Sequence, residues 1–406
     1  MKDRKILVSF FISITLIGAV VFLIEYFNSV SIGPYIPIEP IVSNSNGHGF
    51  AGTTNCIGCH KDIYLSHIET AHFKSSRLAD SISIKGSFSK DNFFLLNDEI
   101  KFSMNSKDDG FYQEALLIAD NSLIDSKKID IVIGSGTKGQ TYLNWQEDEL
   151  YQLQVSYFEP SGSWINSPGY PRGIFAPNRP IRQRCIECHF TFAESKNKFN
   201  KPNAFVKSKI VYGIDCERCH GPAVEHVNFH FKNPNETDGK KIKSYSNFSQ
   251  KQRLEACALC HSGAMRRLEE NPFSFIAGDT LPDHPNPNYN KTSLDSLDVH
   301  GNQYGLLLAS KCFINSKRID CSSCHNPHEN QRGNFDWFNS KCLSCHQQSK
   351  KQIICKMELE KRQNNGNNCV KCHMPLTPSK SMSIYDIKDS LIVPVKVRTH
   401  FIGVYN

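Results

Sequence analysis

Runs of hydrophobic residues divide the chain into an N-terminal segment, a linker and a body. Residues 6–24 contain no charged side chain, and a helix of this length would span about 28 Å, close to the ~30 Å hydrocarbon core of a bilayer. Lys2, Arg4 and Lys5 precede the run and favour a cytoplasmic N-terminus. We expect residues 1–27 to form a membrane anchor, with a cleaved signal segment as the alternative. Residues 28–50, which contain repeated glycine and proline, are expected to be a linker.

The pattern between residues 84 and 170 predicts strands. Short apolar runs such as FFLLNDEIKFSM are separated by turn residues such as SKDDG, and IDIVIGSGTKGQTYLNW and ELYQLQVSYF are rich in β-branched and aromatic residues. GSGTKGQT is partly similar to the motif of a phosphate-binding loop, but that motif requires lysine directly after its last glycine, and this position is Gln140. We therefore interpret it as a glycine-rich hairpin within a small β-rich insertion at 84–170, which follows a first segment at 51–83.

A five-residue word, Cys-x-x-Cys-His, recurs seven times and uses 14 of the 16 cysteines. It is the attachment motif of c-type haem, in which two cysteines form thioethers and the adjacent histidine binds iron as the proximal ligand. Zinc ribbons combine two Cys-x-x-Cys pairs for each ion, which seven pairs each followed by His fit poorly, and a thioredoxin-like dithiol needs a single pair. The sequence thus predicts seven covalently attached haems, iron included. The attachment cysteines are Cys56, Cys59, Cys185, Cys188, Cys216, Cys219, Cys257, Cys260, Cys321, Cys324, Cys342, Cys345, Cys369 and Cys372. The proximal histidines are His60, His189, His220, His261, His325, His346 and His373.

The spacing of the words predicts the domain organisation. The first two words are 129 residues apart and the later ones 21 to 64, so we expect a six-haem domain at 171–406. The predicted fold class is α+β: a mostly helix and loop multihaem cytochrome with stacked haems, plus the small β-rich insertion after the first haem. Hydrophobic residues make up 39% of the chain, part of them in the anchor, and stacked haems would supply the missing apolar surface.

The formal charge of +7 does not by itself indicate anionic partners. Each ferric haem with two ionised propionates adds about one negative charge, so seven haems would bring the total to about zero. No basic run with interleaved aromatic residues indicates nucleic-acid binding.

Nine further histidines are available for the opposite faces of the irons. His226 and His230 are four apart and would lie on one face of a helix, where they could serve two neighbouring haems. His328 lies too close to its own word's histidine and should serve a neighbouring haem, and of His67 and His72 we expect one to be a ligand. The nine are His48, His67, His72, His226, His230, His284, His300, His328 and His400.

Four other sulfur atoms are open to alternatives. Met265 and Met374 are possible iron ligands, although Met374 directly follows its word's histidine and cannot reach the far face. Cys312 and Cys355 lie outside the words; they could pair in an oxidising compartment or stay as two unpaired thiols.

Several segments resemble those of a known group of proteins. CIGCHKDIYLSHIETAH, CERCHGPAVEHV, DVHGNQY, CSSCHNPH and CVKCHMP are similar to segments of the periplasmic multihaem cytochromes c related to the tetrahaem cytochrome c of ammonia oxidisers. The resemblance covers residues 50–80 and 180–405, and the insertion also resembles one branch of that group. It implies His72, His226, His328 and His400 as distal ligands, each serving another haem, with His230 and His300 as further ligands. The seventh would be His48, His67 or His284, or be absent.

We expect a heptahaem electron-transfer protein of a respiratory chain, on the periplasmic side of a bacterial inner membrane. Its expected partners are redox proteins, among them a membrane quinol oxidase, and the membrane itself through the N-terminal segment. The alternative is a haem-dependent oxidoreductase with one open haem, acting on nitrogen or sulfur oxyanions or hydroxylamine, which would need nearby acid–base or cationic groups. Arg179, Arg182 and Arg184 beside the second word are candidates for holding an anion. A third hypothesis treats the β-rich insertion as a docking module.

Overall fold

The computed structural model describes residues 17–20, 35–89, 92–196, 202–263, 273–281, 297–316, 318–346, 355, 357–364, 368–386 and 391–405. The predicted anchor lies outside these residues apart from 17–20, and so do Met265 and His284. Among the described residues, no helix has the length and apolar character needed to cross a bilayer. The membrane anchor stays a prediction.

The described part of the chain contains nearly as much strand as helix. Of these residues, 30% are helical and 28% are in strands, with many antiparallel sheets, so the prediction of a mostly helix and loop cytochrome is wrong. Part of the difference lies after residue 170, where β14 (Phe190–Ser195) pairs with β15 (Phe205–Tyr212) and β16 (Leu376–Asp386) pairs with β17 (Leu391–Arg398). The physical reason is visible in FVKSKIVY and LIVPVKVR, which are rich in β-branched and aromatic residues without the period of a helix.

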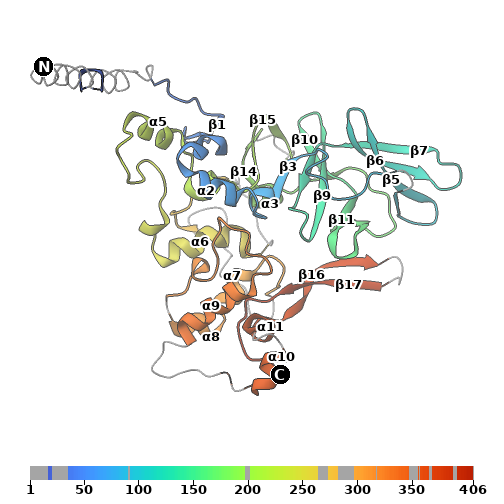
Figure 1. The fold of residues 1–406 in the computed structure, drawn as a ribbon. Helices are drawn as coiled ribbons and strands as arrows, with labels where there is room; N and C mark the ends of the chain where they lie inside the picture. The colour runs from blue at the N-terminus through green and yellow to red at the C-terminus, as the bar shows by residue number, and fades with distance from the viewer. Residues whose placement is uncertain are drawn as a thin grey trace, which may run out of the picture.

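A seven-stranded antiparallel sheet occupies the right of Figure 1, together with a four-stranded meander. The larger sheet has the order β12-β11-β9-β10-β13, with β8 joining β9 to β3. Two of its strands come from outside 84–170, namely β3 (Ser76–Leu78) and β13 (Arg179–Pro180). The others are β8 (Ile131–Ile133), β9 (Gly139–Gln146), β10 (Glu149–Gln152), β11 (Val155–Phe158) and β12 (Ser163–Asn166). The meander consists of β4 (Phe93–Leu95), β5 (Ile100–Lys107), β6 (Gly110–Leu117) and β7 (Leu123–Ile129). We call residues 76–180 the sheet region.

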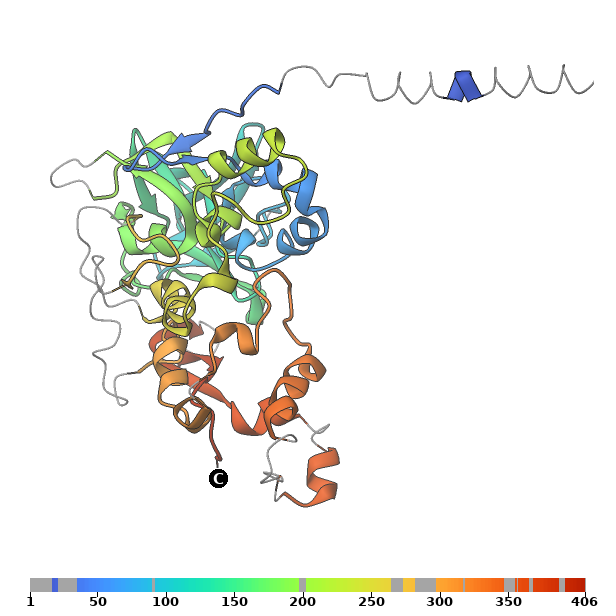
Figure 2. The same ribbon diagram turned by 90° about the vertical axis from the view of Figure 1, so that its left-hand side faces the viewer.

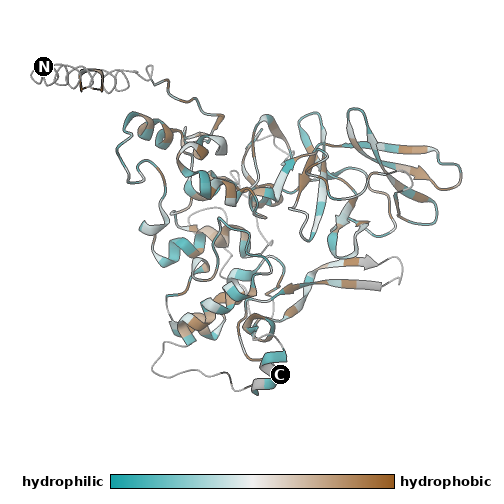
Figure 3. Ribbon diagram, in the orientation of Figure 1, coloured by the Kyte–Doolittle hydropathy of each residue, from teal (hydrophilic) through white to brown (hydrophobic). Residues whose placement is uncertain are grey.

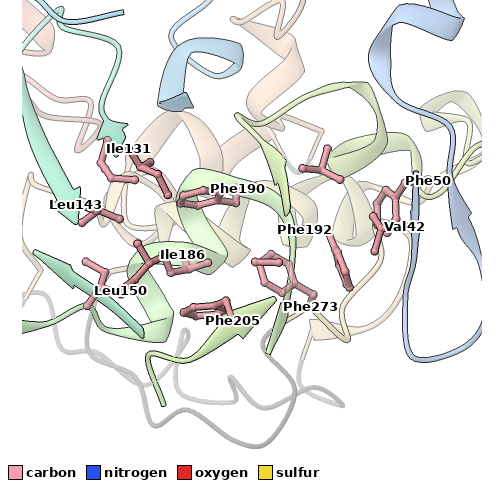
Figure 4. Packing of buried hydrophobic residues seen from close by; sticks show 14 residues of the cluster. Val42, Phe50, Ile131, Leu143, Leu150, Ile186, Phe190, Phe192, Phe205 and Phe273 are labelled. Carbon is pink, nitrogen blue, oxygen red and sulfur yellow. The ribbon is translucent and has the colours of Figure 1, made fainter. Parts of the chain in front are cut away.

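Strand β9 is buried on both faces because successive residues point into different cores. Tyr142, with no exposed surface, packs with Met104 of the meander and with Trp164. Leu143, also fully buried, faces a second core that includes Ile186 and Phe190 (Figure 4). This second core joins the sheet region to the rest of the chain.

The seven words lie on short helices and turns outside the sheet region. We call residues 51–75 and 181–405 the Cys–His region; its helices occupy the left and bottom of Figure 1 and its later part extends downward in Figure 2. The C-terminal hairpin reaches back to the sheet, where Val395 packs with Phe158 and Ile165. Both regions mix hydrophobic and hydrophilic residues along their elements (Figure 3). Before the first word stand β1 (Val42–Ser43) and β2 (Gly49–Phe50). The helices and 3-10 turns are η1 (Thr53–Cys56), α2 (Ile57–His67), η2 (Phe73–Ser75), α3 (Gln183–His189), α4 (Cys216–His220), α5 (Val224–Lys232), η4 (Tyr245–Asn247), α6 (Gln250–His261), α7 (Gln303–Leu308), α8 (Lys311–Ser316), η8 (Cys321–Ser323), α9 (Phe335–His346), α10 (Leu359–Asn364) and α11 (Cys369–His373).

Candidate functional site

Five of the seven words end a helix at their histidine: α3, α4, α6, α9 and α11. The first word runs from η1 into α2, whose helical backbone is interrupted at His60 (φ −117°, ψ 39°), and the fifth forms η8. A histidine at a helix end or kink lies beside the two cysteines of its word, one and four residues before it. Each word therefore presents one imidazole and two sulfurs from a single turn of chain.

Side-chain caps fix the start of three of these turns. Asp215, Asp320 and Asn368 stand directly before the first cysteine of their words, and each side chain accepts a hydrogen bond from a backbone N–H two or three residues later. Asp and Asn are among the preferred N-cap residues and contribute about 1 kcal/mol each. The sequence carries this signal, as DCERCH, DCSSCH and NCVKCH, and it could have placed the start of all three turns.

The cysteines of different words approach one another. Neighbouring thiols shift each other's pKa in three pairs: Cys56 with Cys216, Cys188 with Cys260 and Cys257 with Cys321. Three further pairs interact electrostatically: Cys219 with Cys260, Cys324 with Cys345 and Cys342 with Cys369. These contacts place the words in one continuous series, first, third, fourth, fifth, sixth and seventh, with the second beside the fourth.

Four proximal histidines each face a histidine from another segment. Two imidazoles that bind opposite sides of one metal, through nitrogens at about 2 Å, have ring centres about 6 Å apart. The pairs show this separation: His60–His226 at 6.4 Å, His72–His261 at 6.1 Å, His220–His328 at 6.1 Å and His325–His400 at 6.0 Å. The rings are 10° to 25° from parallel in three pairs and at 71° in His72–His261. The four distal candidates implied by the family resemblance thus each meet a proximal histidine of another word, while iron ligation itself stays a prediction.

Several of these rings are held in the form that binds a metal. Burial lowers the pKa of His72, His261 and His400 to about 4. The side chains of His72 and His261 are exposed, yet the protein packed around them withdraws enough water to produce this shift. These three rings are therefore neutral at pH 7 and carry a free nitrogen lone pair.

Backbone carbonyls orient three further rings. Nδ1 of His220 lies 2.9 Å from the Lys243 carbonyl, and Nδ1 of His226 lies 2.7 Å from that of Lys240. Nδ1 of His373 lies 2.7 Å from the carbonyl of Gly403. A neutral imidazole that donates from Nδ1 leaves Nε2 free for a metal, which is the usual second contact of a metal-binding histidine.

The remaining predicted ligands are less fully arranged. His300 interacts electrostatically with His189, whose pKa is lowered by burial. His230 packs on His226 with ring centres 4.5 Å apart, and its Nε2 accepts a hydrogen bond from the Lys240 N–H at 3.4 Å. In the part of the chain that the structure describes, His346 and His373 have no histidine ring at the distance of the four pairs.

The three candidates for the seventh ligand differ in exposure and in whether the structure describes them. His48 is exposed, and His284 lies outside the described residues. His67 is buried, with Nδ1 3.3 Å from the Pro327 carbonyl and Nε2 3.1 Å from the Ile214 carbonyl. Both ring nitrogens of His67 are thus directed at backbone rather than at a shared metal.

A buried carboxylate between the first and third words was missed by sequence reasoning. Glu217, in a variable position of CERCH, accepts hydrogen bonds from the N–H groups of Ala51, Gly52 and Ala223, each at 2.8 Å. Burial and the nearby charge of Asp215 raise its pKa to about 7. Glu217 therefore ties the chain that enters the first word to the third word.

The residues present fit a haem. Each histidine pair offers two nitrogens, and among the described residues no three or more His, Cys, Asp or Glu side chains are grouped to hold a metal ion alone. A haem iron between two imidazoles takes its equatorial ligands from the porphyrin and needs no further protein ligand. Buried Nε atoms of Arg77, Arg184 and Arg218 lack hydrogen-bond partners within the described part of the chain, and ionised propionates accept such donors.

The structure also describes the three arginines beside the second word and the two cysteines outside the words. Arg184 is buried and ion-paired with Glu187, Arg182 is exposed, and Arg179 donates to Gln152 and to the carbonyl of Pro168. The three do not converge on one anion site.

Cys312 and Cys355 are both free, so the structure contains no disulfide between them.

Comparison with known proteins finds a family similarity over part of this site. Residues 175–221, which contain the second and third words, match the family described as cytochrome c554 and c-prime. No curated protein and no solved structure matches the chain. The match supports a c-type cytochrome with covalently bound haem and a role in electron transfer.

Proposed function

We propose that the chain carries seven c-type haems and transfers electrons along them. The observation that carries the proposal is the continuous series of words, in which sulfur contacts connect neighbouring words and four histidine pairs join segments far apart in sequence. When bound, haem iron supplies one-electron redox chemistry, and histidine on both faces gives a lower potential than histidine with methionine.

The protein's own residues hold and orient the cofactors. The two cysteines of each word form the thioethers, and His60, His220, His261 and His325 provide proximal nitrogens. His226, His328, His72 and His400, in the same order, provide the opposite nitrogens. Each pair joins the proximal histidine of one word to a histidine of a different segment. Removing one haem would therefore disturb the segment that ligates a neighbouring haem, and this interdependence favours a rigid relay.

The helices that carry the words also favour cofactor packing. Helix α9 has no buried residue, and α2 buries only His67, although both carry apolar side chains such as Leu65 and Leu343, which are 46% and 40% exposed. Isolated helices of 11 or 12 residues are marginal in water without a packing partner. Apolar macrocycles on these faces would provide that partner.

We further propose a periplasmic location, with the N-terminal segment as the membrane attachment and redox proteins, including a quinol oxidase, as partners. The support is the uncharged run at 6–24 after three basic residues and the need of c-type cytochromes for an exported attachment site. The resemblance to cytochromes of ammonia oxidisers adds to this proposal.

The proposal is tested by haem content and by EPR and optical spectra, with and without nitrite, hydroxylamine or carbon monoxide. We expect seven haems for each chain, with low-spin signals from the four histidine pairs that do not change when ligands are added. Fewer than seven attached haems would contradict the proposed haem number, and fewer than four would contradict the relay as well. A high-spin haem that binds and turns over nitrite or hydroxylamine would favour the oxidoreductase instead.

A further inference from the structure

His67 contacts the two chain segments that present one histidine pair. Its Nδ1 faces the carbonyl of Pro327, the residue before His328. Its Nε2 faces the carbonyl of Ile214, two residues before the word that ends at His220. In either neutral tautomer one N–H donates to one of these carbonyls, and a protonated ring donates to both. His67 therefore bridges the segments on opposite sides of the His220–His328 pair.

Two more contacts direct the end of α2 at His328. The hydroxyl of Ser66 donates to the His328 carbonyl at 2.6 Å. The ring of His67 meets the ring of His328 edge-on, with centres 6.0 Å apart and planes at 78°. Position and ring orientation of His328 are thus both restrained by two consecutive residues of α2.

The segment that carries His328 has little support of its own. Residues 324–334 contain no helix or strand, and their internal hydrogen bonds are local, such as His328 N–H to Asn326 Oδ1 at 3.1 Å. The segment that carries Ile214 has an additional backbone contact, because the Ile214 N–H donates to the His72 carbonyl at 2.9 Å. The loop therefore depends on His67 and Ser66 for its distance from the third word.

We propose that His67 is a positioning residue that holds His328 opposite His220, and that it is not itself an iron ligand. This inference rests on the proposed function, since it concerns the haem of the Cys216–Cys219 word. A phenylalanine at 67 keeps a ring of similar size but donates to neither carbonyl. The loop then moves independently of the third word, and the iron retains histidine on one face only.

The test compares the haem-loaded full-length protein with His67→Phe, His67→Gln and His328→Ala. Haem content, high-spin EPR signal and the number of haems that bind carbon monoxide are measured for each. His328→Ala removes the distal ring itself and should add one carbon monoxide-binding haem to the wild-type number. His67→Phe should add the same one, while His67→Gln, whose amide donates again, should restore part of the low-spin signal. Asp62→Ala, at an exposed position of the same helix, is the matched control and should equal the wild type.

The outcomes separate the inference from the proposed function. If His328→Ala adds no ligand-accessible haem, the ligand assignment fails, whatever His67 does. If His328→Ala adds one and His67→Phe adds none at equal haem content, the positioning role is overturned. If His67→Phe loses haem, the Ser66→Ala variant is measured instead. A raised high-spin fraction of Ser66→Ala at full haem content supports the inference. Wild-type spectra of both Ser66→Ala and His67→Gln overturn it.

Discussion

The sheet region and the Cys–His region are stabilised by different means. The core between the two sheets contains 12 buried residues, among them Met104 and Tyr142 with no exposed surface. Among the described residues, the largest core wholly within the Cys–His region contains six, and two others contain three each. Another core of 14 buried residues, among them Leu143, Ile186 and Phe190, is shared by the two regions. Because burial of apolar area is the main stabilising contribution to a fold, the sheet region can hold itself together, whereas the parts of the Cys–His region outside the shared core rely on the cofactors and on single polar ties.

The largest expected effect comes from preventing haem attachment. In a chain whose word cysteines are all replaced by alanine, we expect α2, α4 and α9 to lose protection from hydrogen exchange while β5, β6 and β9 keep theirs. Exchange measured on peptides from both regions checks this. Equal protection of α9 in the haem-free and haem-loaded chains would refute the difference between the regions.

A cavity in the sheet core should affect only that region. Met104→Ala removes a fully buried side chain, which costs about 2–5 kcal/mol of unfolding free energy. Denaturant unfolding followed by circular dichroism measures the loss, and the haem spectrum should stay unchanged. Leu123→Ala, at a side chain 59% exposed, is the control and should cost little. A change in haem ligation in Met104→Ala would show that the regions are not independent.

Substitution of Glu217 tests whether its buried hydrogen bonds stabilise the Cys–His region. Glu217→Ala leaves three backbone N–H groups without their acceptor, and each buried unsatisfied donor costs about 1–3 kcal/mol. Relief of repulsion with Asp215 offsets part of this, so we expect a net loss of about 2–4 kcal/mol. Thermal unfolding of the variant measures it, with Glu225→Ala on the exposed side of α5 as control. Equal stability of the two variants would mean that the tie is unimportant.

Gly213 marks a close approach between the first segment and the third word. It has φ +69°, and a Cβ there would lie 2.2 Å from the Phe73 carbonyl oxygen. Gly213→Ala should therefore cost about 1–3 kcal/mol. Gly58→Ala, where an added Cβ would meet no atom within 4 Å, should have no comparable effect on the melting temperature; the reverse order would argue against the close approach.

The last expected effect is a pH dependence of stability that originates in the Cys–His region. The pKa values of His72, His261 and His400 fall from 6.5 to about 4 on folding. As pH falls from 6.5 towards 4, the unfolded chain takes up protons at these positions and the folded chain does not, so stability decreases in this window. Above pH 6.5 these groups contribute no slope. Urea unfolding of the haem-loaded chain between pH 4 and 8 measures this, since iron ligation would also keep these rings unprotonated, and a flat profile in that window would contradict it.

The sequence indicates the words, their caps and the strands of the sheet region, because each is a local pattern. Alternation in FFLLNDEIKFSM and ELYQLQVSYF corresponds to β4 and β5 and to β10 and β11. The hairpins β14–β15 and β16–β17 were missed, since segments next to haem words were expected to be helix or loop. The pairing of His220 with His328, and the bridge made by His67, depend on contacts between segments more than 100 residues apart, which no local pattern encodes.

The most direct test of the account is a crystal structure of the haem-loaded protein with anomalous scattering recorded at the iron edge. We predict iron midway between the rings of His60–His226, His72–His261, His220–His328 and His325–His400, each iron bound to both rings. Iron at these words with other ligands on the far face, or no iron between the paired rings, would contradict it.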